Sequence, residues 1–256
     1  MGESFLNNES NADFSNADLI GTNLSSTNLR GTDFSNADLS DADLSDADFT
    51  RANLKKAVLT SAKLTNVNLT LADISGADLS STDLNFAIFI GTKIDDKTNI
   101  ENKWKLVHQI INSSSRNKNS KKHLREEDLS FAYLDSVDLK RAKLQYVNFE
   151  KSNLNGAFLE SADLRNVVFK GSNLSGADLR RATVDETTNF EDANVNKARF
   201  GNNFGLPKKI QNDLTKRGAI FEKFSIKLPE IKPDKKTHNM PPRYNSQSDE
   251  TQTETE

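Results

Sequence analysis

The chain has 256 residues, 35% of them hydrophobic, a net charge of −3 and no cysteine. This composition argues against a conventional two-layer core and excludes disulfide frameworks, thiolate metal sites and thiol nucleophiles. Because the first residues lack the apolar region of a secretory signal and no apolar run approaches the roughly 20 residues that span a bilayer, we expect a soluble cytoplasmic protein that does not contact membranes.

After an N-terminal extension, residues 1–11, a five-residue period governs the chain. A large apolar residue, called the centre below, occupies every fifth position from Phe14 to Ile94, and Ala, Thr or once Val lies two residues before it. The other three positions are mostly small and polar, as in SNADLSDADLSDADFTRANL, which begins at Ser35. Each five-residue word therefore turns two side chains inward and three outward.

A short extended piece followed by a corner satisfies this pattern. Inward residues two positions apart have the spacing of a strand, and small polar residues are those that corners tolerate. Successive corners wind the chain into a coil, and neighbouring coils can pair through backbone hydrogen bonds about 4.8 Å apart. We therefore expect an all-β solenoid.

The pattern A-[DN]-[LF]-x-x, seen in Ala37-Asp38-Leu39-Ser40-Asp41, resembles that of the pentapeptide-repeat family, including its cyanobacterial members. The resemblance implies a right-handed quadrilateral β-helix with four words to a coil. We assign residues 12–100 to a first repeat block of this kind and residues 124–204 to a second.

With four words to a coil, residues 20 apart should stack on one another. The second block keeps the five-residue step up to Val184 and then slips by one residue to Phe190. Allowing for this slip, the spacing predicts a stack of Phe149, Phe169 and Phe190. The same slip follows Ile94, and in both places the chain reads two acids, a variable residue and Thr-Asn before the next apolar residue. One extra residue in a regular ladder predicts a bulge.

Residues 101–123 interrupt the repeat with a short helical insert and a basic loop. The apolar residues of 101–112 fall on one face of a helix; these are Trp104, Val107, Ile110 and Ile111. We expect Trp104 to anchor this helix and His108 to lie on its exposed surface.

Residues 205–224 carry the signals of a terminal helix. Pro207 suits a first turn and Gly218 follows a basic last turn, and the segment resembles the terminal cap of many cyanobacterial family members. We expect a C-terminal helical cap, because the end of a solenoid exposes unpaired backbone and apolar centres. The composition of residues 225–256 predicts a disordered tail. The amino end has no comparable cap, so we expect a monomer, with a homodimer through that end as the alternative.

Acidic residues are densest in the stretch that begins at Ser35. Paired carboxylates can do general acid/base work when their environments separate their pKa values, but these carboxylates occupy equivalent outward positions. We interpret them first as corner-forming and solubilising residues and second as an acidic binding face, made of Asp38, Asp41, Asp43, Asp46 and Asp48.

Basic residues gather in the loop that follows the helical insert. Such residues can contact phosphates, but no aromatic residue interleaves with them here, so we interpret the loop as solvated and do not expect direct nucleic-acid binding. The candidate contact residues are Arg116, Lys118, Lys121, Lys122 and Arg125.

No signature of an enzyme is present in the sequence. The three histidines lack metal-ligand spacing, neither phosphate-loop fingerprint occurs, and no nucleophile elbow accompanies the serines. We therefore expect no catalysis, no metal and no cofactor.

Two functions remain. The first is a rigid scaffold that presents its outward side chains to a protein partner. The second, implied by gyrase-protecting members of the family, is a DNA mimic that regulates a DNA-binding enzyme such as gyrase. Residues 12–96 favour mimicry with 13 acids against 6 bases, whereas residues 128–204 have 11 against 10. A contiguous row of surface acids would support mimicry, and a mixed surface would support a scaffold.

Overall fold

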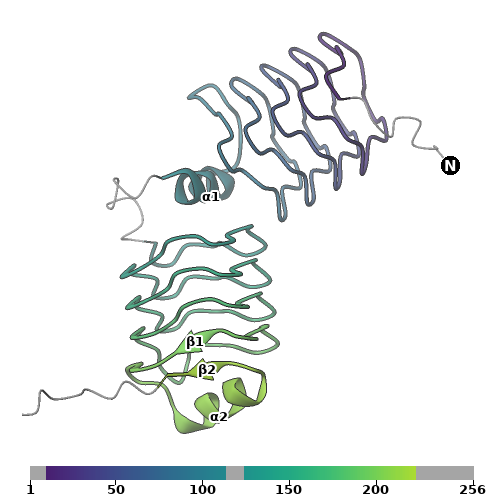
Figure 1. Ribbon diagram of the computed structural model, residues 1–256. Helices are drawn as coiled ribbons and strands as arrows, with labels where there is room; N and C mark the ends of the chain where they lie inside the picture. Colours follow the sequence, from purple (N-terminus) through teal and green to yellow (C-terminus); the bar gives the residue numbers. More distant parts are fainter. Residues whose placement is uncertain (1–9, 114–123, 223–256) are drawn as a thin grey trace, which may run out of the picture. The chain divides into compact units, whose positions relative to one another are not determined.

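The computed structural model describes residues 10–113 and 124–222 (Figure 1). The predicted disordered tail, most of the N-terminal extension and most of the basic loop lie outside these residues. The described part contains two repeat blocks, called block 1 (residues 12–100) and block 2 (residues 124–204), and each is described by itself.

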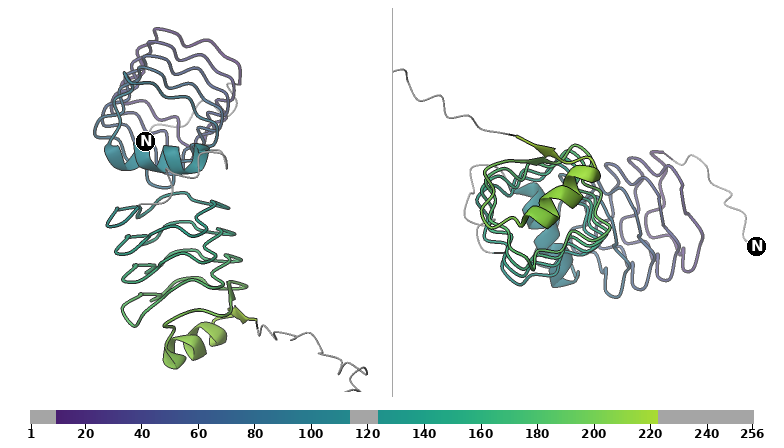
Figure 2. Two further views of the ribbon diagram at one scale, coloured as in Figure 1. Left: turned by 90° about the vertical axis from the view of Figure 1, so that its left-hand side faces the viewer. Right: turned by 90° about the horizontal axis from the view of Figure 1, so that it is seen from below.

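Each block is a stack of four-sided coils whose sides pair in parallel (Figure 2). In block 1, Asp13 pairs with Asp33, 20 residues later, and the same step recurs along both blocks. The N–H of Phe14 donates to the carbonyl of Asp33 at 2.7 Å, and the N–H of Asp33 donates back to the carbonyl of Ala12 at 2.9 Å. The predicted solenoid with four words to a coil is therefore confirmed.

The core of each block consists of the centres and the small residues two positions before them. Phe34, Ala37 and Leu39 are all 0% exposed. Where the small residue is Thr or Ser, its hydroxyl can be satisfied inside the coil, as when Thr82 Oγ1 donates to the carbonyl of Leu79 at 2.7 Å. Each side thus buries one large and one small side chain, which explains how a chain with only 35% hydrophobic residues forms a continuous core.

The corners explain why small polar residues separate the centres. The second residue after each centre has a positive φ, at every fifth position from Asn11 to Gly91. The N–H of Ala37 donates to the carbonyl of Phe34 at 3.0 Å, closing a four-residue turn whose third residue, Asn36, has φ 59°. This is the combination of a type II turn, which favours Gly or Asn at that place.

Leu71 is an unsuitable residue for such a corner. Its φ is 60° and its side chain is 48% exposed, and a left-handed backbone costs ordinary L-residues about 1–2 kcal/mol but Asn less. Leu71→Asn is therefore expected to raise the free energy of unfolding by roughly 0.5–1 kcal/mol, measured by urea denaturation. Leu71→Val, which adds β-branching, should lower it. No gain with Asn would show that packing of the Leu71 side chain outweighs the backbone cost.

Aromatic rings stack along the inside of block 2 as predicted. The rings of Phe149 and Phe169 lie 5.5 Å apart with an interplanar angle of 4°, and those of Phe169 and Phe190 lie 5.3 Å apart at 16°. The one-residue slip before Phe190 is thus absorbed without breaking the column of rings.

Both slips are confirmed as 21-residue steps in the ladder, at the pairs Asp78 with Asn99 and Val168 with Asn189. In the first of these six-residue corners, one carboxylate oxygen, Asp95 Oδ1, accepts the N–H groups of Gly76, Lys97 and Thr98 at 2.9, 3.1 and 3.0 Å. The extra residue is therefore accommodated by an aspartate that collects backbone donors.

The carboxylate of Asp95 makes this corner sensitive to acid. Its pKa is lowered mainly by the hydrogen bond from the Gly76 N–H, with Thr98 and Lys97 adding to the effect against desolvation. Because the folded pKa is depressed, the stabilisation is present above the unfolded pKa of about 3.9 and is lost as the pH falls through the folded pKa. We expect the melting temperature to fall below about pH 4, and less steeply in Asp95→Asn. Asp96→Asn, which removes the same charge one residue later, should retain the parent slope; identical slopes in all three proteins would contradict this role.

The helix α1 (Asn102–Asn112) follows block 1. Its apolar face is buried, through Trp104, Val107 and Ile110. The expectation that His108 is an exposed surface residue was wrong: the side chain is half-buried, and its Nε2 lies 2.8 Å from the carbonyl of Thr92. The reason is that the side of α1 that carries His108 also faces a coil.

Helix α2 (Lys208–Lys216) lies after block 2, between the short strands β1 (Arg199–Phe200) and β2 (Ile220–Phe221). The two strands pair in parallel. The side chain of Leu214 in α2 is 0% exposed. In the described part of the chain, no helix is long and apolar enough to cross a bilayer.

Candidate interaction surfaces

Three of the predicted acidic residues are bound into the backbone of their own turns. Asp38 Oδ1 accepts the N–H of Ser40 at 3.0 Å, and Asp43 and Asp48 accept equivalent N–H groups at 3.1 and 2.9 Å. The hydroxyl of Ser40 also bonds Asp38 and holds the pKa of that carboxyl below its ordinary value. These side chains therefore form Asx turns, a structural role that Asn can also fill.

The other two predicted acids, Asp41 and Asp46, occupy positive-φ corners. Their φ angles are 58° and 60°, and both residues are exposed. Asp tolerates this backbone better than most residues because its short polar side chain can bond locally. The structure thus brings the five predicted residues onto one coil but gives them two different local roles.

Acids do not form a contiguous row along block 1. We call the rows of outward residues that immediately precede the centres, and that pair with one another across coils, the columns. No column in the described part of block 1 has more than two acids in succession. The columns read Asp13-Asp33-Asn53-Asp73-Lys93, Asp18-Asp38-Val58-Asp78-Asn99, Asn23-Asp43-Lys63-Asp83 and Asn28-Asp48-Asn68-Ile88.

Basic side chains from neighbouring coils mask part of the acidic charge. Lys63 Nζ lies 3.5 Å from Asp43, its predecessor in the same column, and Arg30 Nη1 lies 2.9 Å from Asp48. Exposed pairs of this kind contribute only about 0–1 kcal/mol to stability. Their main consequence is a surface of mixed sign.

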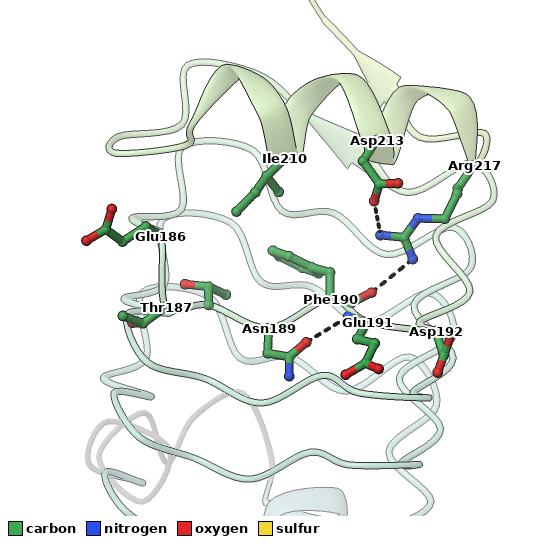
Figure 3. A pocket seen from close by; sticks show the side chains of 10 residues that line it. Glu186, Thr187, Asn189, Phe190, Glu191, Asp192, Ile210, Asp213 and Arg217 are labelled. Carbon is green, nitrogen blue, oxygen red and sulfur yellow. Dashed lines mark hydrogen bonds and ion pairs between the residues drawn. The ribbon is translucent and has the colours of Figure 1, made fainter.

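An open cleft of 670 Å³ lies between α2 and the second six-residue corner. Ile210 and Asp213 project from α2 above Phe190 and Glu191 of the coil (Figure 3). Arg217 closes one end, donating to Asp213 Oδ2 at 2.6 Å and to the carbonyl of Phe190 at 2.9 Å. Within residues 10–113 and 124–222, no group of three His, Cys, Asp or Glu side chains is placed to hold a metal ion.

A model of pentapeptide repeats matches the chain in 8 copies, over residues 10–46, 42–80, 63–96, 123–160 and 142–181. The chain belongs to the pentapeptide-repeat family. Proteins of this family fold as right-handed quadrilateral β-helices. The right-handedness of the coils therefore follows from membership of the family.

Among solved structures, this pentapeptide-repeat protein is similar to Rfr23 from the cyanobacterium Cyanothece 51142, with 33% identity over 37% of this chain and 64% of that chain and a TM-score of 0.36. The match thus spans less than two thirds of Rfr23. It is also similar to HetL, involved in heterocyst differentiation regulation in Nostoc sp. strain PCC 7120, with 26% identity over 75% and 84% of the two chains and a TM-score of 0.26.

A third similar structure is QnrB1, a plasmid-mediated fluoroquinolone resistance protein. It is 15% identical over 82% of this chain and 96% of that chain, with a TM-score of 0.27. No curated protein sequence matches the chain.

The candidate basic contact in this pentapeptide-repeat protein is described at one residue only. Arg125 forms an ion pair with Glu126 at 3.0 Å and lies over the ring of Tyr146, 5.3 Å from its centroid. The remaining members lie outside the described residues: Arg116, Lys118, Lys121 and Lys122.

Sequence reasoning missed an ion-pair network at the end of block 2. Arg180 lies 2.5 Å from Asp178 and 3.1 Å from Glu222, and Arg199 lies 2.6 Å from Glu222. The network ties the chain after β2 to the last coils. Arg199 also lies 3.7 Å from Asp178, 21 residues before it in the sequence. This ion pair could have been found by extending the observed slip to the outward residues as well as to the centres.

Proposed function

We propose that this pentapeptide-repeat protein is a non-enzymatic scaffold that presents outward side chains to a protein partner. The observation that carries the proposal is the mixed sequence of the columns, in which Asn, Lys, Val and Ile interrupt the acids. A surface of mixed sign and hydrogen-bonding character suits recognition of a particular protein surface.

The regular backbone supports the same role. Each side of a coil is hydrogen-bonded to the coils on either side of it along most of each block. Side chains on such a frame are already positioned before binding, so less conformational entropy is lost when a partner binds. A rigid mixed surface is what a scaffold requires.

Mimicry of DNA is the second candidate, favoured by the acidity of block 1. Its roughly four coils rise about 20 Å, a length over which duplex DNA carries about 12 charges. Residues 12–96 carry 13 acids against 6 bases, a net charge of −7. Block 1 therefore has little more than half of the charge density of DNA, and its acids are divided among interrupted columns. For this reason, regulation of an enzyme such as gyrase is the weaker proposal.

We place α2 and β2 as the cap of block 2. In support, β2 extends the parallel ladder by pairing with β1, the ring of Phe221 stacks on Phe200 with centroids 5.1 Å apart, and Leu214 is fully buried. A cap of this kind covers the apolar centres of the last coil and leaves the outward columns available to a partner.

A variant in which the five acids of the acidic face are replaced by neutral residues, called the charge-neutral variant below, tests which surface the partner uses. Replacing Asp38, Asp41, Asp43, Asp46 and Asp48 by Asn removes five charges but keeps both local roles, because Asn23 already fills the turn position and Asn36 the corner. Partners of the full chain would be identified by proximity labelling in the source organism, and direct binding of each purified candidate would be measured by calorimetry.

The expected result is direct binding by the parent chain and at least tenfold weaker binding by the variant at an unchanged melting temperature. A purified partner that binds both proteins equally would show that the binding surface lies on another face. If no purified candidate binds the parent chain directly, the scaffold proposal fails.

A further inference from the structure

The sequence contains one Asn-Gly pair, Asn155-Gly156, and it falls on a corner of block 2. The side-chain amide of an asparagine is open to attack by the backbone nitrogen of the next residue, and glycine hinders this attack least because it has no side chain. The attack forms a bond from Gly156 N to Asn155 Cγ and breaks the bond from Cγ to Nδ2. Nδ2 leaves as ammonia with the proton of the Gly156 N–H, and a cyclic succinimide remains.

Water opens the succinimide at either of its two carbonyls. Opening at Cγ restores the main chain, with aspartate at position 155. Opening at the backbone carbonyl leads the main chain through Cγ as isoaspartate, which lengthens it by one CH₂ group, about 1.5 Å. Whether these reactions occur depends on how the fold holds the two reacting groups.

In the folded chain, the peptide group between Asn155 and Gly156 is held by the coils on both sides of it. The carbonyl of Asn155 accepts the N–H of Ser136 at 2.8 Å, and the N–H of Gly156 donates to the carbonyl of Ser175 at 2.8 Å. Because the Gly156 nitrogen must lose this proton in order to attack, its bond to Ser175 protects the pair from reaction.

The side-chain amide of Asn155 is held towards the opposite neighbour. Its Nδ2 donates to Asp135 Oδ1 at 2.8 Å, one coil earlier, whereas the Gly156 nitrogen is bonded to Ser175, one coil later. Both residues are only half-buried, so water reaches this corner. The hydrogen bonds of the ladder, and not exclusion of water, therefore keep the pair unreactive.

We propose that Asn155-Gly156 is a deamidation site that is closed while block 2 is folded, reacts when this corner opens, and then prevents the corner from closing again. Local openings of this kind occur in folded proteins at a fraction of the cost of global unfolding. A carboxylate at position 155 would face Asp135, and like charges opposite each other are destabilising. Isoaspartate would in addition separate the two backbone groups that bond Ser136 and Ser175, because of its extra CH₂ group.

Mass mapping of peptides from the full chain tests the closed state. The chain would be incubated at one pH and temperature in buffer and in enough guanidinium to unfold it, with heavy-oxygen water to label each opened succinimide. We expect conversion at Asn155 to be at least about tenfold slower in buffer, because only the open fraction reacts. Equal rates in the two solutions, or no conversion in guanidinium, would overturn the proposal.

Asn155→Ser is the matched variant for the effect of the product. The same corner one coil later already reads Ser175-Gly176, with Gly176 at φ 67°, and serine cannot form the succinimide. After the same incubation in guanidinium and dilution, we expect this variant to recover its circular dichroism signal. The parent should lose refolded protein in proportion to its isoaspartate at position 155. A parent that contains isoaspartate there and refolds as completely as the variant would show that the product does not prevent closure.

Discussion

Replacement of Leu159 by aspartate is expected to unfold block 2 under conditions in which the parent protein is fully folded. Leu159 is 0% exposed, and its neighbours on the same inner side, Leu139 and Leu179, are equally buried. A carboxylate at this place would have no partner in an apolar column, and a buried unpaired charge costs several kcal/mol or forces the group to take up a proton. Because whole domains are stable by only about 5–15 kcal/mol, we expect loss of the cooperative thermal transition in circular dichroism.

The matched control for Leu159→Asp is the residue immediately before it. Phe158 points outward, is 41% exposed and lies under Lys140, whose Nζ is 4.9 Å from the ring centroid. Phe158→Asp loses an exposed cation–π contact, worth about 0.5–1 kcal/mol. It also places a carboxylate between Asp138 and Asp178 of the same column, an unfavourable but solvent-screened arrangement, so the melting temperature should fall by a few degrees without loss of the cooperative transition. Equal damage from the two variants would show that the inward and outward faces have been assigned incorrectly.

Phe169→Ala is expected to lower the free energy of unfolding by about 3–5 kcal/mol. The ring is 0% exposed and stacks between Phe149 and Phe190 at centroid distances of 5.5 and 5.3 Å. Removing it leaves a cavity, and the coils around it can collapse inward only by distorting the backbone hydrogen bonds that join them. Guanidinium denaturation monitored by circular dichroism measures the change.

Val168→Ala is the control for the Phe169 variant, because Val168 precedes the centre and is only half-buried. We expect a loss of less than about 1 kcal/mol. Phe169→Leu should lie between the two, since it keeps much of the buried volume but no ring. A loss below 1 kcal/mol for Phe169→Ala would mean that the aromatic stack contributes little to block 2.

Much of the fold could be predicted because a period of five leaves few alternatives. Only a coil with two inward residues per word buries Leu39 together with Ala37, and counting by 20 then places Phe149 next to Phe169. The slips were visible for the same reason, since one extra residue shifts every later centre. Inward positions therefore follow from the sequence by counting.

The roles of the outward residues could not be obtained by counting. Counting separates Asp38 from Asp41 by their places in the word but does not say what each place does: the first accepts a backbone N–H and the second occupies a left-handed corner. The burial of His108 depends on how α1 packs, and the contact of Arg199 with Glu222 depends on where the chain returns after α2. These features arise from tertiary contacts that a local pattern does not contain.

The claim that this protein is a scaffold with a mixed surface is tested most directly against DNA mimicry. Purified chain would be added in increasing molar excess to a gyrase supercoiling assay, with the charge-neutral variant of the acidic face alongside. We expect no change in the rate of supercoiling with either protein, because the acids of block 1 are interrupted in every column. Inhibition by the parent chain that disappears in the charge-neutral variant would contradict the scaffold and establish the mimic.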